Sequence, residues 1–164
     1  MTREPIDLGA ALASFDRLWS PRIVTRVNDY DVRVAKVAGE HVWHAHDDTD
    51  EFFLVLAGEL RIALRDGGPA PEGSGSDGPG SDGSGVGGSG VGGSGVGGSG
   101  VGGERVVVLP RGSVFVVPRG VEHRPSSDGG ASILMFEPSG TSSVGDRHEE
   151  VPAHVDATTG HALG

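Results

Sequence analysis

Two histidines and a glutamate stand close together in the amino-terminal half of the chain. Their spacing is His44-x-His46-x4-Glu51, and Gly58 follows. Residues two positions apart point to the same side of a β-strand, so the two imidazoles would face the same way. Glu51 follows an acidic turn and begins the next apolar run, where a returning strand can bring its carboxylate alongside. Imidazoles and a carboxylate are the ligand set of catalytic transition-metal sites, so this spacing indicates a metal centre.

Short β-strands are the elements that would position these residues. Apolar or alternating runs predict the strands, and Pro-Arg-Gly at 110–112 and 118–120 predicts turns between them. Before the strands, Asp7 could cap a short helix whose apolar positions continue to Trp19, and Ser20-Pro21 would end it. One short helix followed by many strands predicts an all-β sandwich or barrel. The predicted strands begin near Ile23 and include residues 30–37, 42–46, 52–57, 60–64, 105–109, 113–117 and 131–136.

Residues 67–103 interrupt this pattern. They hold 19 of the chain's 30 glycines and repeat Val-Gly-Gly-Ser-Gly from residue 86 onward. Such a composition buries too little apolar surface to offset its ordering entropy, so we expect a disordered loop, with a lid as the less favoured alternative. We therefore expect a helical segment at 1–22 packing on the barrel, a β-barrel at 23–138 that contains the insert, and a flexible tail at 139–164.

Composition and charge exclude several classes of protein. The chain of 164 residues carries a formal net charge of −10, has a single lysine and contains no cysteine. Disulfides and thiolate ligands are therefore excluded. Without a basic stripe, neither nucleic acid nor an anionic membrane is an expected partner. The first residues lack the apolar core of a signal peptide, so a cytoplasmic location is the default expectation.

A second motif, Gly112-x5-Pro118-x-Gly120-x2-His123, lies after the insert. Together with the first motif, which begins at Gly39, it resembles the two signature motifs of the cupin superfamily. The resemblance implies a double-stranded β-helix, or jelly roll, that holds one divalent transition metal inside the barrel. Gly39 is one residue closer to the histidines than is usual, and Ser127 stands where asparagine is common. The implied metal ligands are His44, His46, Glu51 and His123, and the implied turn residues are Gly58, Gly112, Pro118 and Gly120.

Three imidazoles and one carboxylate would leave two adjacent positions free on an octahedral metal. Iron, manganese, nickel, cobalt, copper and zinc all accept this set. The resemblance favours dioxygenase-like oxidative chemistry on a small molecule over isomerase or lyase chemistry, with Glu51 also acting in proton transfer. The alternative is a non-catalytic module that binds a small ligand or a metal. The expected apolar pocket walls are Phe53, Val55, Phe115, Val117 and Met135.

Residues 52–56 and 114–117 are apolar at every position, so both faces of these strands need cover. The amino-terminal helix can supply part of it, and a second copy of the chain the rest, which predicts a homodimer. Trp43 and Phe53 are expected to pack in the barrel, and Arg124 to form a surface ion pair. The histidines that match no motif position are expected to be solvated: His41, His148, His154 and His161.

Overall fold

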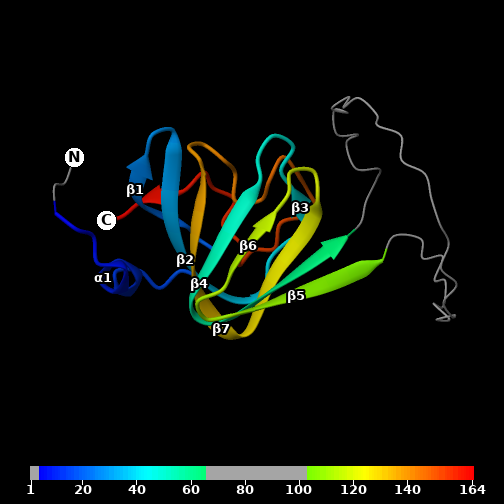
Figure 1. Ribbon diagram of the computed structural model, residues 1–164, viewed down its shortest axis with the longest axis horizontal. Coiled ribbons are helices and arrows are strands. Elements are labelled where there is room, and N and C mark those ends of the chain that lie inside the picture. Colours follow the sequence, from blue (N-terminus) through cyan, green and yellow to red (C-terminus); the bar gives the residue numbers. More distant parts are fainter. Residues whose placement is uncertain (1–3, 66–102) are drawn as a thin grey trace, which may run out of the picture.

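Strands make up most of the part of the chain that the computed structural model describes, residues 4–65 and 103–164 (Figure 1). The predicted flexible insert lies outside the described residues, apart from Gly103. In chain order, the elements are α1 (Leu8–Ala13), β1 (Arg22–Val27), β2 (Tyr30–Glu40), β3 (His44–Ala45), β4 (Glu51–Arg65), β5 (Glu104–Pro110), β6 (Val114–Val117), β7 (Glu122–Pro138), β8 (Arg147–His148) and β9 (His161–Ala162).

Two long antiparallel strands, β4 and β7, form the centre of the fold. Their pairing runs from Phe52 opposite Phe136 to Arg65 opposite Glu122, with register shifts around Ala57 and Gly58. On the first half of β4 the other neighbour is β6, and on the second half it is β5. The late half of β7 pairs with β2, and β2 pairs with β1. Each long strand therefore has different neighbours along its two halves, and all nine strands belong to one sheet, consistent with the predicted all-β jelly roll.

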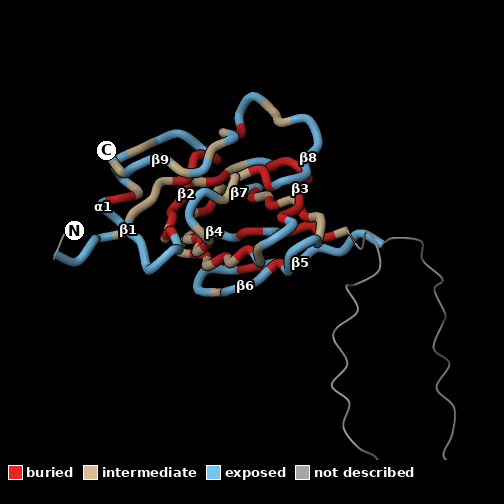
Figure 2. Tube along the Cα trace, turned by 90° about the horizontal axis from the view of Figure 1, so that it is seen from above, coloured by how far each residue is buried: buried red, intermediate tan, exposed pale blue. Residues whose placement is uncertain are grey.

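The core lies inside the barrel, where buried segments of the long strands face one another (Figure 2). Alternate residues of β4 and β7 point inward, because side chains alternate across a strand. Phe53 and Val55 are buried in this way on β4, as are Ile133 and Met135 on β7.

The glycine-rich insert connects two strands whose ends are already adjacent. Arg65, at the end of β4, pairs with Glu104, at the start of β5. A connection between directly paired antiparallel residues can be a short turn. The barrel therefore needs only a short connection at this point.

Several predicted boundaries were wrong. The helix ends at Ala13, although Asp7 caps it as expected by accepting a hydrogen bond from the Ala10 amide. Trp19 instead adopts a positive φ of 51° and is buried in the core. The predicted strands 52–57 and 60–64 form the single strand β4, and β7 begins nine residues earlier than expected, at Glu122. Within the described ranges, no helix has the length and apolar character needed to cross a membrane.

The carboxy-terminal segment packs against the barrel, contrary to the expected loose tail. Val144 and Val155 belong to the buried core. The Asp146 amide donates a hydrogen bond to the Ala45 carbonyl at 2.9 Å, and β8 pairs with β3. Ser, Thr and Gly made this segment look like surface chain, but its two buried valines and its strand pairing hold it in place.

Candidate metal centre

The structure brings together the four residues that the two motifs suggest. His44 lies on β3, His46 follows that strand, Glu51 begins β4, and His123 is the second residue of β7. His44 and His123 are direct partners in antiparallel pairing. The Gly120 amide donates to the His46 carbonyl at 2.6 Å, which ties the second motif's turn to the first motif. All four side chains are buried.

Three imidazole nitrogens converge on one carboxylate oxygen. The Nε2 atoms of His123, His46 and His44 lie 2.6, 3.2 and 3.7 Å from Oε2 of Glu51. One ligand atom from each of the four residues lies within 4.8 Å of every other. Donor atoms bound to one transition metal at about 2.1 Å lie roughly 3 Å apart, so the cluster fits a single ion.

Backbone contacts fix which nitrogen two of the three imidazoles present. Nδ1 of His44 lies 2.9 Å from the Val42 carbonyl, and Nδ1 of His123 lies 3.0 Å from the Val121 carbonyl. A carbonyl only accepts, so both Nδ1 atoms donate, which leaves Nε2 as the metal-facing atom. Among the described residues, the buried Nε2 atoms of His44 and His46 have no hydrogen-bond partner. Two unpartnered, inward-facing nitrogens are what a metal site requires.

The charges in the cluster suit a cation. Burial alone would raise the pKa of Glu51, but contacts with the three imidazoles hold that pKa well below its ordinary value. Burial lowers the pKa of His44, against the opposing effect of Glu51. Burial also acts to lower the pKa of His46, but Glu51, with Glu137 and Asp146, outweighs it and raises that pKa. The site therefore holds an ionised carboxylate among imidazoles. Of His44 and His46, the ring of His46 is the more readily protonated.

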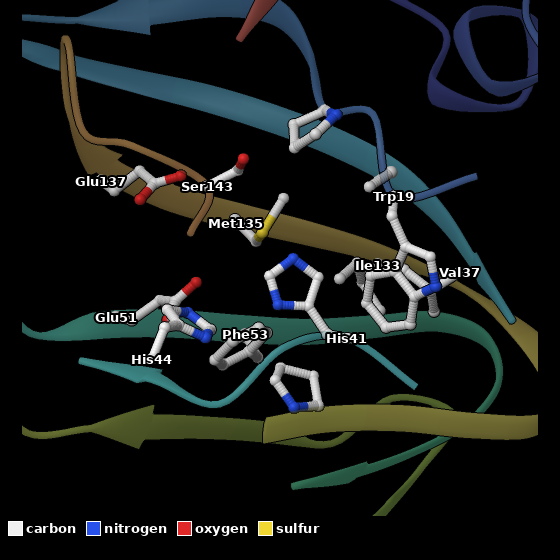
Figure 3. A pocket seen from close by; sticks show the side chains of 13 residues that line it. Trp19, Val37, His41, His44, Glu51, Phe53, Ile133, Met135, Glu137 and Ser143 are labelled. Atoms are coloured by element: carbon white, nitrogen blue, oxygen red, sulfur yellow. The ribbon is translucent and has the colours of Figure 1, made fainter. Parts of the chain in front are cut away.

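An apolar pocket opens beside this cluster (Figure 3). Its cavity volume is about 30 Å³, and His44 and Glu51 form part of its wall. Of the predicted wall residues, Phe53 and Met135 line it, whereas Val55 and Val117 are in the core away from it. Phe115 packs against the core and does not line the pocket either. The remaining apolar wall comes chiefly from Trp19, Ala35, Val37 and Ile133.

His41 is part of the pocket wall, and its predicted solvation was wrong. Its ring is buried between Trp19 and His44, with centroids 5.0 and 4.9 Å away. Burial lowers its pKa to about 3, so the ring is neutral at physiological pH. The backbone explains its place, because the His41 amide donates to the Pro125 carbonyl at 2.9 Å and draws the segment against β7. His148, His154 and His161 are exposed, as expected.

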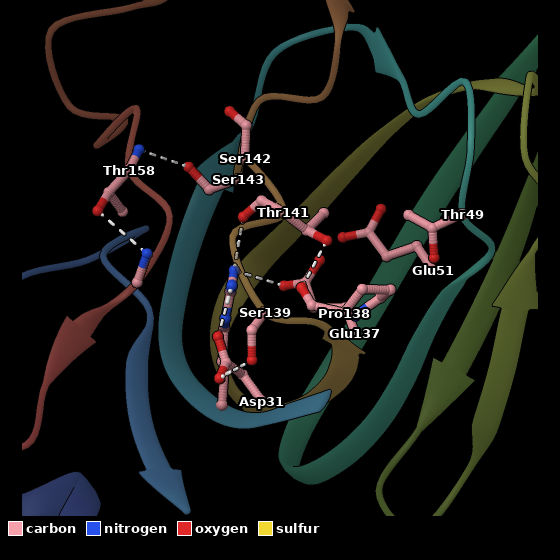
Figure 4. A network of polar contacts seen from close by, with 12 residues as sticks. Asp31, Thr49, Glu51, Glu137, Pro138, Ser139, Thr141, Ser142, Ser143 and Thr158 are labelled. Atoms are coloured by element: carbon pink, nitrogen blue, oxygen red, sulfur yellow. Dashed lines mark hydrogen bonds and ion pairs between the residues drawn. The ribbon is translucent and has the colours of Figure 1, made fainter. Parts of the chain in front are cut away.

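A buried polar network behind the pocket was missed from the sequence (Figure 4). Arg33 is fully buried on β2 and donates to Oε1 of Glu137 at 2.8 Å and to Oδ2 of Asp31 at 3.0 Å. Glu137 also lines the pocket. The signal was present: Glu137 lies two residues after Met135, a predicted wall residue, and thus on the same face of its strand.

Two aromatic residues and an arginine near the site behave as expected. Trp43 is buried, and the Arg65 guanidinium carbon lies 3.7 Å from the centre of its ring. Phe53 belongs to the core as well as to the pocket wall. Arg124 pairs with Glu40 at 3.1 Å on the surface and does not line the pocket.

Comparisons with known proteins agree with this architecture. No protein-family model matches the chain. It is 51% identical to the protein YdbB of Bacillus subtilis over 43 residues, which are 26% of this chain and 38% of YdbB. The hydroquinone 1,2-dioxygenase of a Sphingomonas species, in complex with 4-nitrophenol, shares the fold: 18% identity, a TM-score of 0.54, and coverage of 82% of this chain and 32% of that one.

A solved structure from Shewanella frigidimarina matches most of this chain. It is a cupin-2 domain containing protein with 31% sequence identity and a TM-score of 0.57. The match covers 81% of this chain and 93% of that one. Together with the jelly roll and the buried His-His-Glu-His group, this shows that the chain belongs to the cupin superfamily.

Proposed function

We propose that this cupin binds one divalent transition metal through His44, His46, Glu51 and His123. The observation that carries the proposal is the convergence of three imidazole Nε2 atoms on Oε2 of Glu51, at the wall of an apolar pocket. When bound, such a metal supplies Lewis acidity and free positions for a small molecule or dioxygen.

The protein's own residues define the kind of molecule that fits. Trp19, Phe53, Ile133 and Met135 exclude water and favour a mostly apolar ligand. No lysine or arginine is among the residues that line this pocket, so a phosphorylated ligand would find no cationic side chain there to hold its phosphate. This supports oxidative, dioxygenase-like chemistry on a small organic molecule over the isomerisation of phosphorylated sugars. Glu51 would serve as a ligand and as a catalytic carboxylate.

Metal analysis of the untagged protein tests the site. We expect about one ion per chain in the wild type, and at least a tenfold loss of affinity in His46→Ala because one ligand is removed. His154→Ala is the matched control, since its exposed ring lies outside the cluster. A wild type that holds no metal after reconstitution with any of the six candidate ions would refute the proposal.

A non-catalytic, ligand-binding module is the alternative, because the proposed ligands would bind a metal equally well without turnover. Oxygen uptake by the metal-loaded protein, measured against a panel of small phenols and enols, separates the two. Uptake that disappears in His44→Ala supports the enzyme. Saturable binding without uptake or product supports the module.

We also propose that the chain forms a homodimer through the outer face of the sheet that contains β6. Val114 and Val116, two positions apart and therefore on the same face of β6, are 60% and 46% exposed, so they leave apolar surface for a second copy of the chain to cover. A cytoplasmic location stays a prediction.

A further inference from the structure

Glu137 brings a second carboxylate to the pocket. Its Oε1 accepts a hydrogen bond from Arg33, whereas its Oε2 is buried and has no hydrogen-bond partner among the described residues. Buried polar atoms are nearly always paired, so an unpaired carboxylate oxygen in a pocket wall points to a missing partner. Figure 3 shows Glu137 at the same end of the pocket as Glu51, with Trp19 at the other end.

The structure holds this carboxylate in a fixed orientation. Arg33 is fully buried and also donates to the Thr141 carbonyl at 2.9 Å and to Asp31. Asp31 in turn accepts hydrogen bonds from Arg26 and from the Ser139 hydroxyl. Since these contacts anchor the guanidinium from several sides, they keep Oε1 of Glu137 on Arg33 and leave Oε2 free for a ligand.

The surroundings of Glu137 allow it to change protonation near neutral pH. The charged and titratable groups that face it are Glu51 on β4, His46 after β3, and Arg33 and Asp31 on β2. Burial, followed by the charge of Glu51, raises the pKa of Glu137 to about 8, and Arg33 and His46 oppose this rise. A cation beside Glu51 would favour the ionised form. An acid–base group works best when its pKa lies near the working pH.

Building on the proposed metal site, we propose that Glu137 is the acid–base residue of the pocket, which exchanges a proton with a hydroxyl group of the bound small molecule. The metal, when bound, would make such a hydroxyl more acidic. The O–H bond of the ligand would then break, with the electron pair staying on its oxygen and the proton moving to Oε2 of Glu137. The proton returns when the ligand leaves. Glu51 is less suited to this role, because its Oε2 lies at the centre of the metal cluster. The expected ligands are weakly acidic hydroxyl compounds, such as phenols, enols or hydroxamic acids.

Proton counting during ligand binding tests this role without any turnover. The protein is loaded with Co(II), and acetohydroxamic acid is titrated in by calorimetry in two buffers of different ionisation enthalpy, at a pH above the raised pKa of Glu137, where its carboxylate is ionised. In the wild type, Glu137 takes the proton and almost none reaches the buffer. In Glu137→Gln, about one proton per site should appear in the buffer, because the amide cannot accept it. Binding should also weaken roughly tenfold.

Asp128→Asn is the matched control, because Asp128 is an exposed carboxylate on the same strand, β7, outside the pocket. It should behave like the wild type. The Co(II) absorption spectrum reports whether each variant still holds the metal. Equal proton counts in wild type and Glu137→Gln would overturn the inference and leave the metal site intact. Failure of the wild type to bind Co(II) would instead refute the proposed function, and this inference with it.

A pH series on the wild type gives the same test if Glu137→Gln does not fold. As the pH falls, Glu137 becomes protonated before the ligand arrives and can no longer accept. The proton count should therefore rise from near zero to about one over the range in which Co(II) stays bound. A count of about one at every pH would overturn the inference.

Discussion

Three imidazoles around one carboxylate oxygen make each ligand's protonation depend on the others. The ionised Glu51 that would attract a metal also stabilises protonated His46. Protons and metal ions therefore compete for the same nitrogen. Of His44 and His46, the competition is stronger at His46, because its pKa is raised while the pKa of His44 is lowered.

As the pH is lowered, metal affinity should therefore begin to fall at a higher pH than it would for a site whose histidines have ordinary pKa values. The metal needs neutral His46, and the protonated form of this ring persists to a higher pH than usual. As the pH decreases through the raised pKa of His46, affinity should drop about tenfold per pH unit. Competition with a chromophoric chelator across the neutral range measures this.

Asp146→Asn provides the matched variant. Asp146 contributes to the raised pKa of His46, and the amide can still accept the hydrogen bond that the Asp47 amide donates at 2.9 Å. The midpoint of metal release should move to lower pH in this variant. A midpoint that stays in place, or moves upward, would contradict the electrostatic account.

The sequence predicted the four ligand-cluster residues because their spacing is local and their chemistry is unusual. It did not predict Arg33, Glu137 or His41 in the interior. A charged or titratable residue on a strand normally points to solvent, since burying an unpaired charge is costly. Here Arg33 and Glu137 are buried as partners from β2 and β7, 104 positions apart in the chain. Only the pairing of those strands reveals that they meet.

At the scale of elements, a bend in β4 separates the half that begins at the metal site and pairs with β6 from the half that pairs with β5. Gly58 lies at this bend with a φ of +75°, where β4 and β7 change register. A Cβ atom at this position would overlap the Gly130 carbonyl oxygen and lie 2.9 Å from the Ala131 Cα atom. Because both contacts are backbone atoms, β7 itself would have to move.

Gly58→Ala should therefore destabilise the protein by roughly 3 kcal/mol or more, from the left-handed backbone together with the overlap. Gly39→Ala is the matched control, since Gly39 has a φ of +72° but no atom lies within 4 Å of the place that an alanine Cβ would take. It should cost only about 1 kcal/mol. Urea unfolding of both variants measures the difference, and equal losses would show that the contact with β7 does not matter.

Element boundaries were harder to predict than element types. The early half of β7 contains Pro125, Asp128, Gly129 and Gly130, which read as turn residues. They form a strand because β4 and β2 pair with this segment over long sequence distances. The helix ended early for a similar reason, since Trp19 donates its indole N–H to the Ala38 carbonyl at 2.8 Å and is held at the pocket. Tertiary contacts outweighed local propensity in both places.

At the scale of the whole molecule, one outer face of the barrel is apolar across four strands. Val114 and Val116 on β6 pair with Leu54 and Phe52 on β4, so these side chains share a face. The face continues through residues of β7 and β2 that pair with them in turn, and Tyr30 stacks on Phe136 at its far side with ring centroids 4.9 Å apart. The face comprises Tyr30, Val32, Phe52, Leu54, Val114, Val116, Leu134 and Phe136.

Val116→Asp should therefore convert the predicted homodimer to a monomer. A charge in the middle of an apolar interface would be desolvated without a partner, which typically costs several kcal/mol of association energy. Because Val116 is 46% exposed within one chain, the barrel itself should stay folded, as circular dichroism can verify. Light scattering over a range of concentrations gives the mass.

Val106→Asp is the matched control: Val106 is 55% exposed but pairs with Ala63 in the second half of β4, outside the apolar face. It should leave the dimer intact, and a wild type that is monomeric at high concentration would refute the proposed interface.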